Sequence, residues 1–248
     1  MKDSSMIFGL HAVMEAIRSD REIDTIYIRR ELQSDLAKEL LAAVQDRNIV
    51  VRRVPVERLN RITSKNHQGV IAYLQVVPYQ RLEDILPFVY EEGRSPFVVM
   101  LDGVTDVRNF GAIARSCECA GVDALVIPAR GSAAISADAV KTSAGALLSL
   151  PVCREAGIAE AIRMLHDHGV MVVAASEGAS ELHTSLDLGH SPVALLLGSE
   201  DEGIAAAHLR MADRRVRIPV YGSIQSLNVS VAASVLMYEV VRQRKLMK

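Results

Sequence analysis

The sequence of 248 residues lacks tryptophan and has only three cysteines, Cys117, Cys119 and Cys153. This number fits neither a framework of paired disulfides nor a zinc site with four cysteine ligands. Cys117 and Cys119 also lie two positions apart, where a helix would point their side chains away from each other. Free cysteine is usually buried, so we expect all three to be core residues. The histidines show no metal-ligand spacing, and we expect no metal site.

Long apolar runs are missing as well. No run approaches the ~18 consecutive apolar residues that suggest a membrane span. The first residues, Met-Lys-Asp-Ser-Ser-Met, lack the basic-then-apolar order of a signal peptide. We therefore expect a cytoplasmic protein. Half of the residues are hydrophobic, which is enough for one large or two modest domains, each with its own core.

A strong charge of one sign is also missing, since the formal net charge is −2. Bulk charge therefore does not indicate a nucleic-acid partner. Between Arg52 and His67, however, basic residues outnumber acidic ones by five to one, and the one acid is Glu57. Such a short run is usually a solvated face, and RNA binding is the alternative. The basic residues of this segment are Arg52, Arg53, Arg58, Arg61 and Lys65.

Residues 1–76 alternate between helical and strand-like patterns, which predicts a small α/β domain. Residues 77–95 contain prolines, a glycine and a charge-rich stretch, which predicts a linker that carries one short helix. We therefore place a domain boundary there. The helices expected in the first domain are 10–18, 33–46 and 56–62, and the strands are 23–28, 49–54 and 70–76.

Residues 96–248 restart the pattern with strands that are almost continuously apolar. Apolar strands that alternate with helices are typical of a mostly parallel sheet covered on both faces, so the fold class that we expect is α/β. The expected strands are 97–101, 124–127, 170–174, 193–197 and 216–218. The expected helices are 110–120, 137–148, 158–168, 204–211 and about 228–244.

The last expected helix has apolar residues on two of its faces. Val229 and Leu236 have the spacing of one face, whereas Val231 and Tyr238 lie on another. A helix that is apolar on more than one side is usually buried. We therefore expect this helix to be largely buried.

Three polar loops follow the expected strands, at 102–111, 198–203 and 221–228. The carboxyl ends of parallel strands meet at one edge of an open sheet, so one pocket could hold all three loops. None of the loops matches the Gly-x-Gly-x-x-Gly pattern of a dinucleotide site or a Walker A loop. Nicotinamide chemistry and P-loop ATP chemistry are therefore disfavoured.

Each loop carries a recognisable motif. The first reads Asp-Gly-Val-Thr-Asp-x-x-Asn-x-Gly-Ala from 102, with Arg115 beyond it, and the second reads Leu-Gly-x-Glu-x-x-Gly from 197. The third reads Ile-Pro-x-x-Gly-x-x-x-Ser-Leu-Asn-Val-Ser-Val-Ala from 218. Together with Asn-His-Gln-Gly-Val from 66 and Lys-Thr-Ser-Ala-Gly-Ala from 141, these motifs resemble the SpoU-type RNA ribose 2′-O-methyltransferases of the SPOUT superfamily.

The resemblance covers nearly the whole chain and is closest to enzymes that methylate a guanosine of bacterial 23S rRNA. It implies a SPOUT domain at 96–248 that binds S-adenosylmethionine, contains a deep trefoil knot and forms a homodimer. It also implies an RNA-substrate-binding domain at 1–76 that is similar to ribosomal protein L30e. Periodicity alone does not predict a knot, because true knots are rare exceptions. The alternatives are 2′-O-methylation of tRNA and a non-catalytic RNA-binding protein of ribosome assembly.

By the same resemblance, the cofactor is held by Gly198, Ile218 and Leu227. The catalytic set that it implies is Asn109, Arg115, Glu200, Ser226 and Asn228. Helix capping is the alternative role for Asn109, Ser226 and Asn228, and a surface ion pair is the alternative for Arg115.

Two members of this set differ in their capacity to take a proton. A guanidinium stays protonated, so we expect Arg115 to bind phosphate or stabilise a developing alkoxide rather than act as a base. Glu200 is the only carboxylate of the set, although orienting loop N–H groups or Arg115 suits it better. Position 199 is Ser where the family commonly has Asn, and Ser still offers an oxygen.

Overall fold

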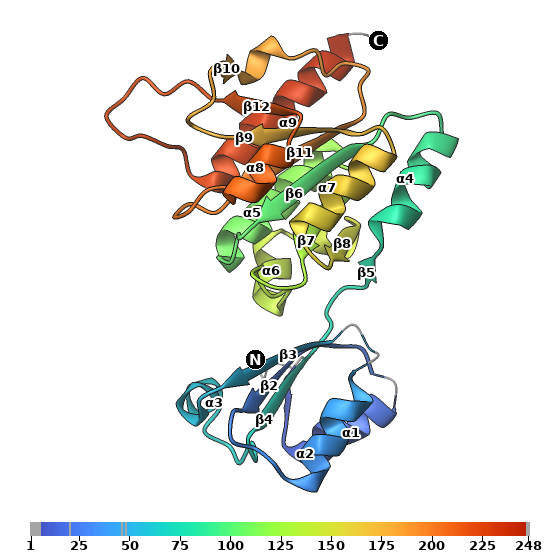
Figure 1. Ribbon diagram of the computed structural model, residues 1–248, viewed down its shortest axis with the longest axis vertical. Coiled ribbons are helices and arrows are strands. Elements are labelled where there is room, and N and C mark those ends of the chain that lie inside the picture. Colours follow the sequence, from blue (N-terminus) through green and yellow to red (C-terminus); the bar gives the residue numbers. More distant parts are fainter. Residues whose placement is uncertain (1–5, 20, 46, 48, 247–248) are drawn as a thin grey trace. The chain divides into compact units, whose positions relative to one another are not determined.

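The chain forms two units, Met1–Val76 and Val77–Lys248 (Figure 1). The computed structural model describes residues 6–19, 21–45, 47 and 49–246. Among the helices in this described part, none combines the length and the apolarity that a membrane span requires. The same residues include no group of three or more His, Cys, Asp or Glu side chains that could hold a metal ion.

The smaller unit is built on a four-stranded sheet with the order β1-β4-β2-β3. Strand β4 is antiparallel to β1 and β2, whereas β2 and β3 are parallel. Residues on alternate positions of a strand face opposite sides, and Ile26 and Val70 face the side on which α1 and α2 pack. The elements of this unit are β1 (Met6–Phe8), α1 (Leu10–Arg18), β2 (Ile23–Arg29), α2 (Asp35–Ala43), β3 (Val50–Val54), α3 (Val56–Ile62) and β4 (Val70–Leu74).

The sequence patterns predicted every element of the smaller unit except β1, whose three residues are too few to show a period. The helix expected at 33–46 begins at Asp35, because the Ser34 hydroxyl accepts a hydrogen bond from the N–H of Ala37 and caps it. The structure ends this helix at Ala43, and Asp46 lies outside the described residues.

The larger unit is built on an eight-stranded sheet with the order β10-β12-β9-β11-β6-β7-β8-β5, in which the described pairings are parallel. The strands of this unit are β5 (Tyr79–Gln80), β6 (Phe97–Asp102), β7 (Ala124–Pro128), β8 (Val152–Glu155), β9 (Met171–Ala175), β10 (Glu181–Leu182), β11 (Val193–Gly198) and β12 (Arg214–Arg217). The helices are α4 (Leu82–Glu91), α5 (Val107–Ala120), α6 (Ala137–Thr142), α7 (Ile158–Asp167), α8 (Ala206–Met211) and α9 (Val229–Leu246). The α/β fold with a parallel sheet that the sequence predicted is therefore confirmed.

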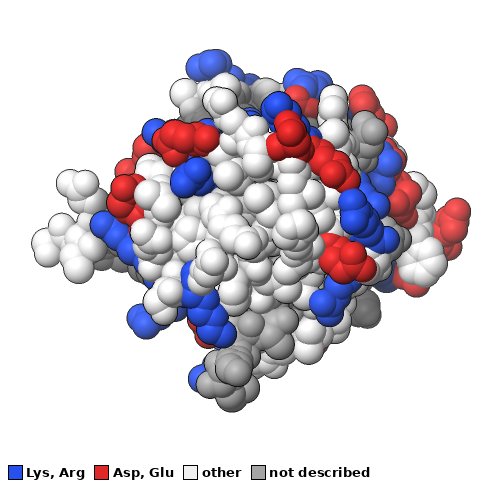
Figure 2. Space-filling model, turned by 90° about the horizontal axis from the view of Figure 1, so that it is seen from below, with Lys and Arg blue, Asp and Glu red and all other residues white. Residues whose placement is uncertain are grey.

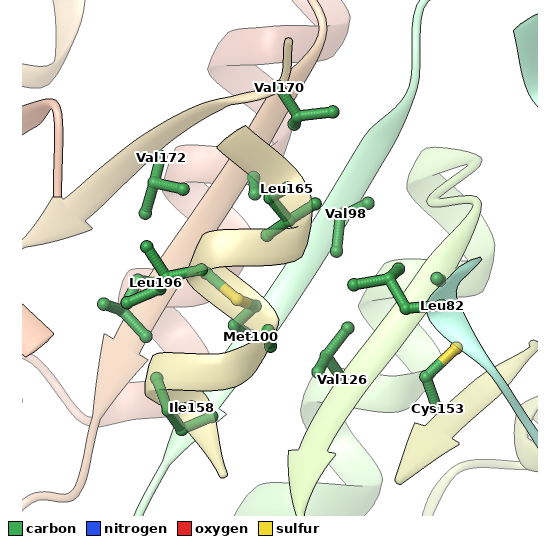
Figure 3. Close-up of a cluster of buried hydrophobic side chains, with 14 of the residues drawn as sticks. Leu82, Val98, Met100, Val126, Cys153, Ile158, Leu165, Val170, Val172 and Leu196 are labelled. Carbon is green, nitrogen blue, oxygen red and sulfur yellow. The ribbon is translucent and has the colours of Figure 1, made fainter. Parts of the chain in front are cut away.

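Helices cover both faces of this sheet. On one face, Leu165 of α7 packs over Val98 of β6 and Leu196 of β11 (Figure 3), and the same core cluster includes side chains of α4. On the other face α5 and α9 pack together, with the hydroxyls of Ser116 and Ser234 2.9 Å apart. The two-sided cover explains why these strands are apolar without alternation.

Residues 77–95, which we expected to form a linker, belong to the larger unit instead. Strand β5 pairs with β8, and Leu82 and Leu86 of α4 are fully buried. The N–H of Leu82 donates to the Glu155 carboxylate at 3.0 Å. The prolines and charges suggested a linker, but the apolar side of α4 completes a core that only the folded sheet creates.

The sequence also misjudged the region between β7 and α7. The helix expected at 137–148 is broken, because Ala144 and Gly145 adopt positive φ angles of 52° and 88°. A separate one-turn helix follows at Ala146–Leu148. Strand β8 was not predicted, since Arg154 and Glu155 interrupt its apolar pattern.

The cysteine prediction holds for two of the three residues. Cys117 and Cys153 are buried, and burial raises the pKa of the Cys153 thiol to about 12. Burial also raises the pKa of the Cys117 thiol well above its ordinary value. Cys119 is exposed, so the prediction of a core residue was wrong there, because its side of α5 faces away from the sheet.

Only one face of α9 is buried within the chain. Val229 and Leu236 lie in the core as expected, whereas Val231 and Tyr238 are 48% and 52% exposed. The expectation of a largely buried helix is therefore wrong for this second face.

Candidate functional site

Two of the three polar loops, at 198–203 and 221–228, meet at the carboxyl edge of the larger unit's sheet, beyond β9, β11 and β12, around a cavity of about 410 Å³. This volume lies within the range of small-molecule sites, which is roughly 300–1,000 Å³. Glycines and apolar side chains alternate with carboxylates along its wall. The lining includes Glu177, Gly178, Leu197, Gly198, Ser199, Glu200, Asp201, Glu202, Gly203, Ile204, Arg217, Ile218, Gln225, Ser226, Leu227 and Val229. The loop at 102–111 contributes no lining residue, so the expectation that one pocket holds all three loops is wrong for that loop.

Gly198 ends β11 at a point where the chain folds back on itself. A Cβ atom at this position would lie 2.0 Å from the carbonyl carbon of Gly203 and 2.2 Å from the amide nitrogen of Ile204. No side chain fits there, so the glycine is required by the loop's own backbone. Gly203 supports the same reversal with a φ of 67°.

The loop at 199–203 is held by short-range hydrogen bonds. Ser199 and Gly203 exchange backbone hydrogen bonds at 3.2 and 3.0 Å, and the Ser199 hydroxyl accepts from the N–H of Glu202 at 3.1 Å. Serine therefore supplies the oxygen that we expected at position 199. On the far side of the loop, the Asp102 carboxylate accepts from the N–H of Ala205 at 2.9 Å and from His208 Nδ1 at 2.7 Å. These bonds join the loop to the end of β6.

Three polar residues that are far apart in the sequence meet beside the cavity. Asn228 Nδ2 donates to Asn109 Oδ1 at 3.0 Å and to the Glu200 carboxylate. The same Glu200 oxygen accepts from the N–H of Val229 at 3.4 Å. Asn109, Glu200 and Asn228 therefore form one cluster, to which α5, the loop after β11 and the start of α9 each contribute one residue.

Asn228 is also the cap of α9. Its Oδ1 accepts from the N–H of Ser230 at 2.9 Å and from the Ser230 hydroxyl at 2.6 Å. The predicted capping role is therefore confirmed for Asn228. For Asn109 it is wrong, since Asp106 caps α5 by accepting from the N–H of Asn109 at 2.8 Å. A cap from Asp106 leaves the Asn109 side chain available for the cluster.

Two further members of the expected catalytic set lie outside this network. Arg115 is exposed on α5, two turns beyond Asn109, and no hydrogen bond or ion pair joins it to another described residue. The alternative role of a surface ion pair is thus not seen for Arg115. Ser226 is exposed in the loop before α9, where it lines the cavity and does not cap the helix.

All three residues expected to hold a cofactor line the cavity. Gly198 ends β11 and Ile218 follows β12, two strands that flank β9 in the sheet, and Leu227 lies on the loop before α9, 39% exposed. The sequence reasoning missed Glu177 and Arg217, which also line it. Glu177 comes two residues after β9, and Arg217 is the last residue of β12. Their position at the carboxyl end of a strand was the signal that could have identified them.

The basic segment of the smaller unit is divided between two sides of its sheet. Arg52 pairs in register with Tyr27 and shares its side, whereas the neighbouring Arg53 lies on the opposite side and donates to the Arg30 carbonyl at 3.3 Å. Arg58 and Arg61 on α3 line a shallow open groove. On the face shown in Figure 2, basic and acidic side chains are mixed around a largely uncharged centre.

Comparison with protein families gives matches along most of the chain. A model described as the SpoU rRNA Methylase family matches residues 96–238, and a model described as RNA 2′-O ribose methyltransferase substrate binding matches residues 6–80. Among curated proteins, YacO of Bacillus subtilis, assigned to the TrmH family of tRNA/rRNA methyltransferases, is 31% identical over 238 residues, which cover 96% of this chain and 95% of YacO. A protein of Staphylococcus aureus assigned to the same family is 34% identical over 242 residues, 98% of this chain and 97% of the relative.

Solved structures show the same similarity. The SpoU methyltransferase AviRb from Streptomyces viridochromogenes, in complex with the cofactor AdoMet, is 27% identical with a TM-score of 0.62, covering 97% of this chain and 90% of AviRb. An AdoMet-bound rRNA methyltransferase from Sinorhizobium meliloti is 28% identical with a TM-score of 0.62, covering 96% of this chain and 86% of that protein.

Proposed function

Because the chain belongs to the SpoU family of RNA methyltransferases, which use S-adenosylmethionine, we propose that it methylates the ribose 2′-hydroxyl of a guanosine in 23S rRNA. The observation that carries the proposed site is the cluster of Asn109, Glu200 and Asn228 beside a cavity of about 410 Å³. The presence of Asn109, Arg115, Glu200, Ser226 and Asn228 together counts against a binding-only protein of the same fold, which has no need for all five.

The residues around the cavity fit S-adenosylmethionine. Ile218 and Leu227 offer apolar walls for a flat adenine ring, and the sharp turn at Gly198 exposes backbone groups to a ligand. Carboxylates such as Glu177 and Glu200 complement a ligand that carries a positive charge. When bound, the cofactor supplies a methyl group on a sulfonium, which an oxygen nucleophile can accept.

We assign Arg115 to the RNA and not to the cofactor. It is exposed, does not line the cavity and lies on the helix that also carries Asn109. Its guanidinium remains charged at neutral pH, so it binds a phosphate or stabilises the developing alkoxide of the 2′-oxygen. Holding the hydroxyl in line with the methyl group supplies much of the rate by orientation alone.

We assign Glu200 to positioning. Its carboxylate already accepts from the Asn228 amide and the Val229 N–H, so it fixes the start of α9 against the loop after β11. Asn228 transmits this position to Asn109 on α5. Ser226 is exposed on the cavity wall, where its hydroxyl is available to the cofactor or to the ribose.

We further propose that the smaller unit is an L30e-like domain that binds the RNA. The family description matched at residues 6–80 supports this role, as do Arg52, Arg58 and Lys65 of the basic segment, which share one side of the sheet. Ribose methylation requires no base-specific chemistry, so the choice of nucleotide depends on RNA shape and on single-stranded contacts. That choice falls to the smaller unit.

A homodimer of the larger unit is part of the proposal. Val231 and Tyr238 lie seven residues apart, two turns of one face of α9, and both are about half exposed. A second copy would bury this apolar stripe. Replacing Tyr238 with Glu should convert a dimer to a monomer in light scattering after size exclusion, and a wild-type monomer would contradict the assignment.

The deep trefoil knot is also a proposal. Helix α9 packs against α5, and its Gln243 donates to the Leu186 carbonyl and accepts from the N–H of Leu188. Arg244 of the same helix donates to the carbonyls of Pro96 and Ser191. These contacts join the chain end to two segments that are far apart in the sequence, at 96 and at 186–191, and they support a threaded chain end. Single-molecule stretching should show an unfolded chain that remains shorter than an unknotted chain of this length.

The substrate is tested by mapping 2′-O-methyl groups in RNA from a strain that lacks this chain. We expect one missing methyl group in 23S rRNA, and tritium transfer from labelled S-adenosylmethionine to that rRNA in vitro. If a tRNA methyl group is missing instead, the proposed reaction is correct but its substrate is tRNA. Absence of transfer to any RNA would support the non-catalytic alternative.

A further inference from the structure

The sheet of the smaller unit has two sides that differ in chemistry. One side packs aliphatic residues such as Ile26, Ile28 and Ala72 against α1 and α2. The other side carries the aromatic residues Phe8, Tyr27 and Tyr73 in a cluster with α3. We call this second side the aromatic face.

The rings of the aromatic face lie close together and are incompletely covered by the described residues. The register pairs Ile71 with both Phe8 and Tyr27, and Tyr73 follows two positions later on the same side of β4. The rings of Tyr27 and Tyr73 meet edge to face, with centroids 6.0 Å apart. Each of the three side chains is only partly buried. The small hydrophobic cluster under α3 therefore leaves part of these three aromatic side chains uncovered.

Cations lie directly over these rings. The Arg58 guanidinium carbon is 5.5 Å from the centroid of Tyr27, and Lys65 Nζ is 5.5 Å from the centroid of Phe8. Arg52 shares the side of Tyr27 through the parallel register. Positive charge and flat rings therefore occupy one surface, and both are features of single-stranded RNA sites.

We propose that the aromatic face binds unpaired nucleotides of the RNA substrate, with one base stacked on the guanidinium plane of Arg58. This inference rests on the proposed function as an RNA methyltransferase and adds the form of RNA that the smaller unit selects. Tyr27 holds the guanidinium in place, so its outer surface, which is exposed, presents a preformed platform. Lys65 and Arg52 neutralise the phosphates on either side of the stacked base.

Unpaired RNA fits this face better than a duplex. A paired helix keeps the faces of its bases stacked inside, so it could use only the charges and not the rings. Arginine is required at position 58 because a planar guanidinium stacks on a base, whereas a lysine ammonium is only a point charge. The structure also provides a matched control, since Arg53 belongs to the same basic segment but lies on the opposite side of the sheet.

The test compares Arg58→Lys with Arg53→Lys in the full-length chain. Dissociation constants are measured for a short single-stranded RNA and for the fully paired duplex of the same sequence. Stacking of one base contributes enough for Arg58→Lys to weaken single-strand binding by roughly 5- to 100-fold, while duplex binding stays the same. Arg53→Lys should change neither constant. A fluorescent adenine analogue in the single strand should lose emission on binding to the wild type and recover it with Arg58→Lys.

Other results would overturn the inference. If Arg58→Lys binds the single strand and the duplex more weakly by the same factor, Arg58 contacts a phosphate and not a base. If it binds both RNAs as the wild type does, the aromatic face does not bind RNA. Thermal melting of Arg58→Lys distinguishes loss of the platform from loss of the fold, and a second variant, Tyr27→Leu, should reproduce the weaker binding. Methyl transfer is measured on the same samples. If the wild type transfers methyl groups but Arg58→Lys quenches the adenine analogue as the wild type does, only the platform is refuted. If the wild type quenches the analogue but transfers no methyl group to any RNA, only the proposed function is refuted.

Discussion

The cavity of the larger unit and the aromatic face of the smaller unit, our two proposed binding sites, are built in different ways. The cavity is shaped by backbone, because β11 and β12 end there and Gly198 leaves no room for a side chain. The aromatic face consists of side chains, since the rings of Phe8 and Tyr27 on the sheet lie under the exposed cations of Lys65 and Arg58. The first site is fixed by the fold, and the second by side-chain chemistry on the fold.

This difference has consequences for mutation. Replacing a residue that shapes backbone should disturb structure and binding together. Replacing an exposed cation of the smaller unit should change RNA binding by a salt-dependent amount and leave the fold intact. The cluster of Asn109, Glu200 and Asn228 lies between these extremes, since its side chains both join backbone segments and border the site. We expect the effects of mutation to decrease from Arg115 through Gly198 and Asn228 to the basic segment.

The largest effect should come from Arg115, an exposed side chain of α5 that does not line the cavity. We expect Arg115→Ala to lower methyl transfer by about 10²–10³-fold, the usual cost of removing one donor to a developing negative charge. Binding of S-adenosylmethionine should change little, because Arg115 does not line the cavity. Tritium transfer and isothermal titration measure the two quantities.

Arg108→Ala is the control for Arg115, because Arg108 is an exposed arginine on the same helix. It should retain most of the turnover. If both variants lose the same amount of methyl transfer, Arg115 contributes only a general positive charge. If Arg115→Ala also loses S-adenosylmethionine binding, its assignment to the RNA and not to the cofactor is wrong.

The next effect tests whether backbone shapes the cavity. In Gly198→Ala, the new Cβ would lie 2.0 Å from a backbone carbon, so the loop at 199–203 must move. Overpacking of this kind costs about 3 kcal/mol, which corresponds to roughly a 100-fold loss of S-adenosylmethionine affinity. The melting temperature should fall as well.

The chain offers a close control for this substitution. Gly178 lines the same cavity, but a Cβ there would meet no atom within 4 Å. Gly178→Ala should therefore leave affinity and melting nearly unchanged. If both alanine variants bind the cofactor alike, the cavity does not depend on the backbone approach at Gly198.

Asn228 should show an intermediate effect with two separable parts. Asn228→Ala removes the cap of α9, which should lower the free energy of unfolding by about 1 kcal/mol. It also removes the amide that joins Asn109 to Glu200, so turnover should fall about tenfold or more, at a rough cost of 1.5–3 kcal/mol for hydrogen bonds to a charged group. Denaturant unfolding and tritium transfer measure the two parts.

Asn228→Ser separates these parts, because a serine hydroxyl can cap a helix but cannot bridge the two partners. We expect its stability to return to that of the wild type while turnover stays low. Recovery of both properties would show that the cluster matters only for folding. An unchanged melting point of Asn228→Ala without cofactor would remove the capping role.

The smallest effect should come from the basic segment. Replacing Arg58 and Arg61 together with Ala should weaken binding of fully paired RNA, which uses only the charges, by a few-fold at moderate salt, since removing one phosphate interaction lowers the log–log salt slope by roughly 0.7–0.9. Cofactor affinity should stay the same, because neither residue lines the cavity. Turnover at saturating RNA should also persist.

Binding measured over a series of salt concentrations tests this prediction, with Arg53→Ala as the control from the opposite side of the sheet. An unchanged slope in the double variant would make the segment a solvated face. The RNA-binding surface would then be sought near Arg108, Arg115 and Lys141.

Much of this architecture could be predicted from local patterns in the sequence. Periodicity located most of the helices and strands, because burial of one side of an element repeats along the chain. The motifs at 102, 197 and 218 also indicated the family, and those at 197 and 218 a shared pocket at the carboxyl edge of the sheet. The split between Arg52 and Arg53 was implicit too, since they are neighbours in a predicted strand and must face opposite sides.

Other features depended on the tertiary structure. The patterns could not place α4 in the core, because the apolar surface that Leu82 and Leu86 meet exists only in the folded sheet. They also suggested burial for both apolar faces of α9, although Tyr238 remains half exposed within one chain. The motif identified Gly198 as important, but it did not show that the backbone of Gly203 and Ile204 leaves no room for a side chain there.

The cluster beside the cavity shows the limit most clearly. The motifs named Asn109, Glu200 and Asn228, and only packing shows that one amide joins the other two across 119 and 28 positions of sequence. Local patterns report how each segment divides its side chains between core and solvent. Contacts between distant residues depend on how strand ends and helices meet in three dimensions, since hydrogen bonds form only within about 3.5 Å.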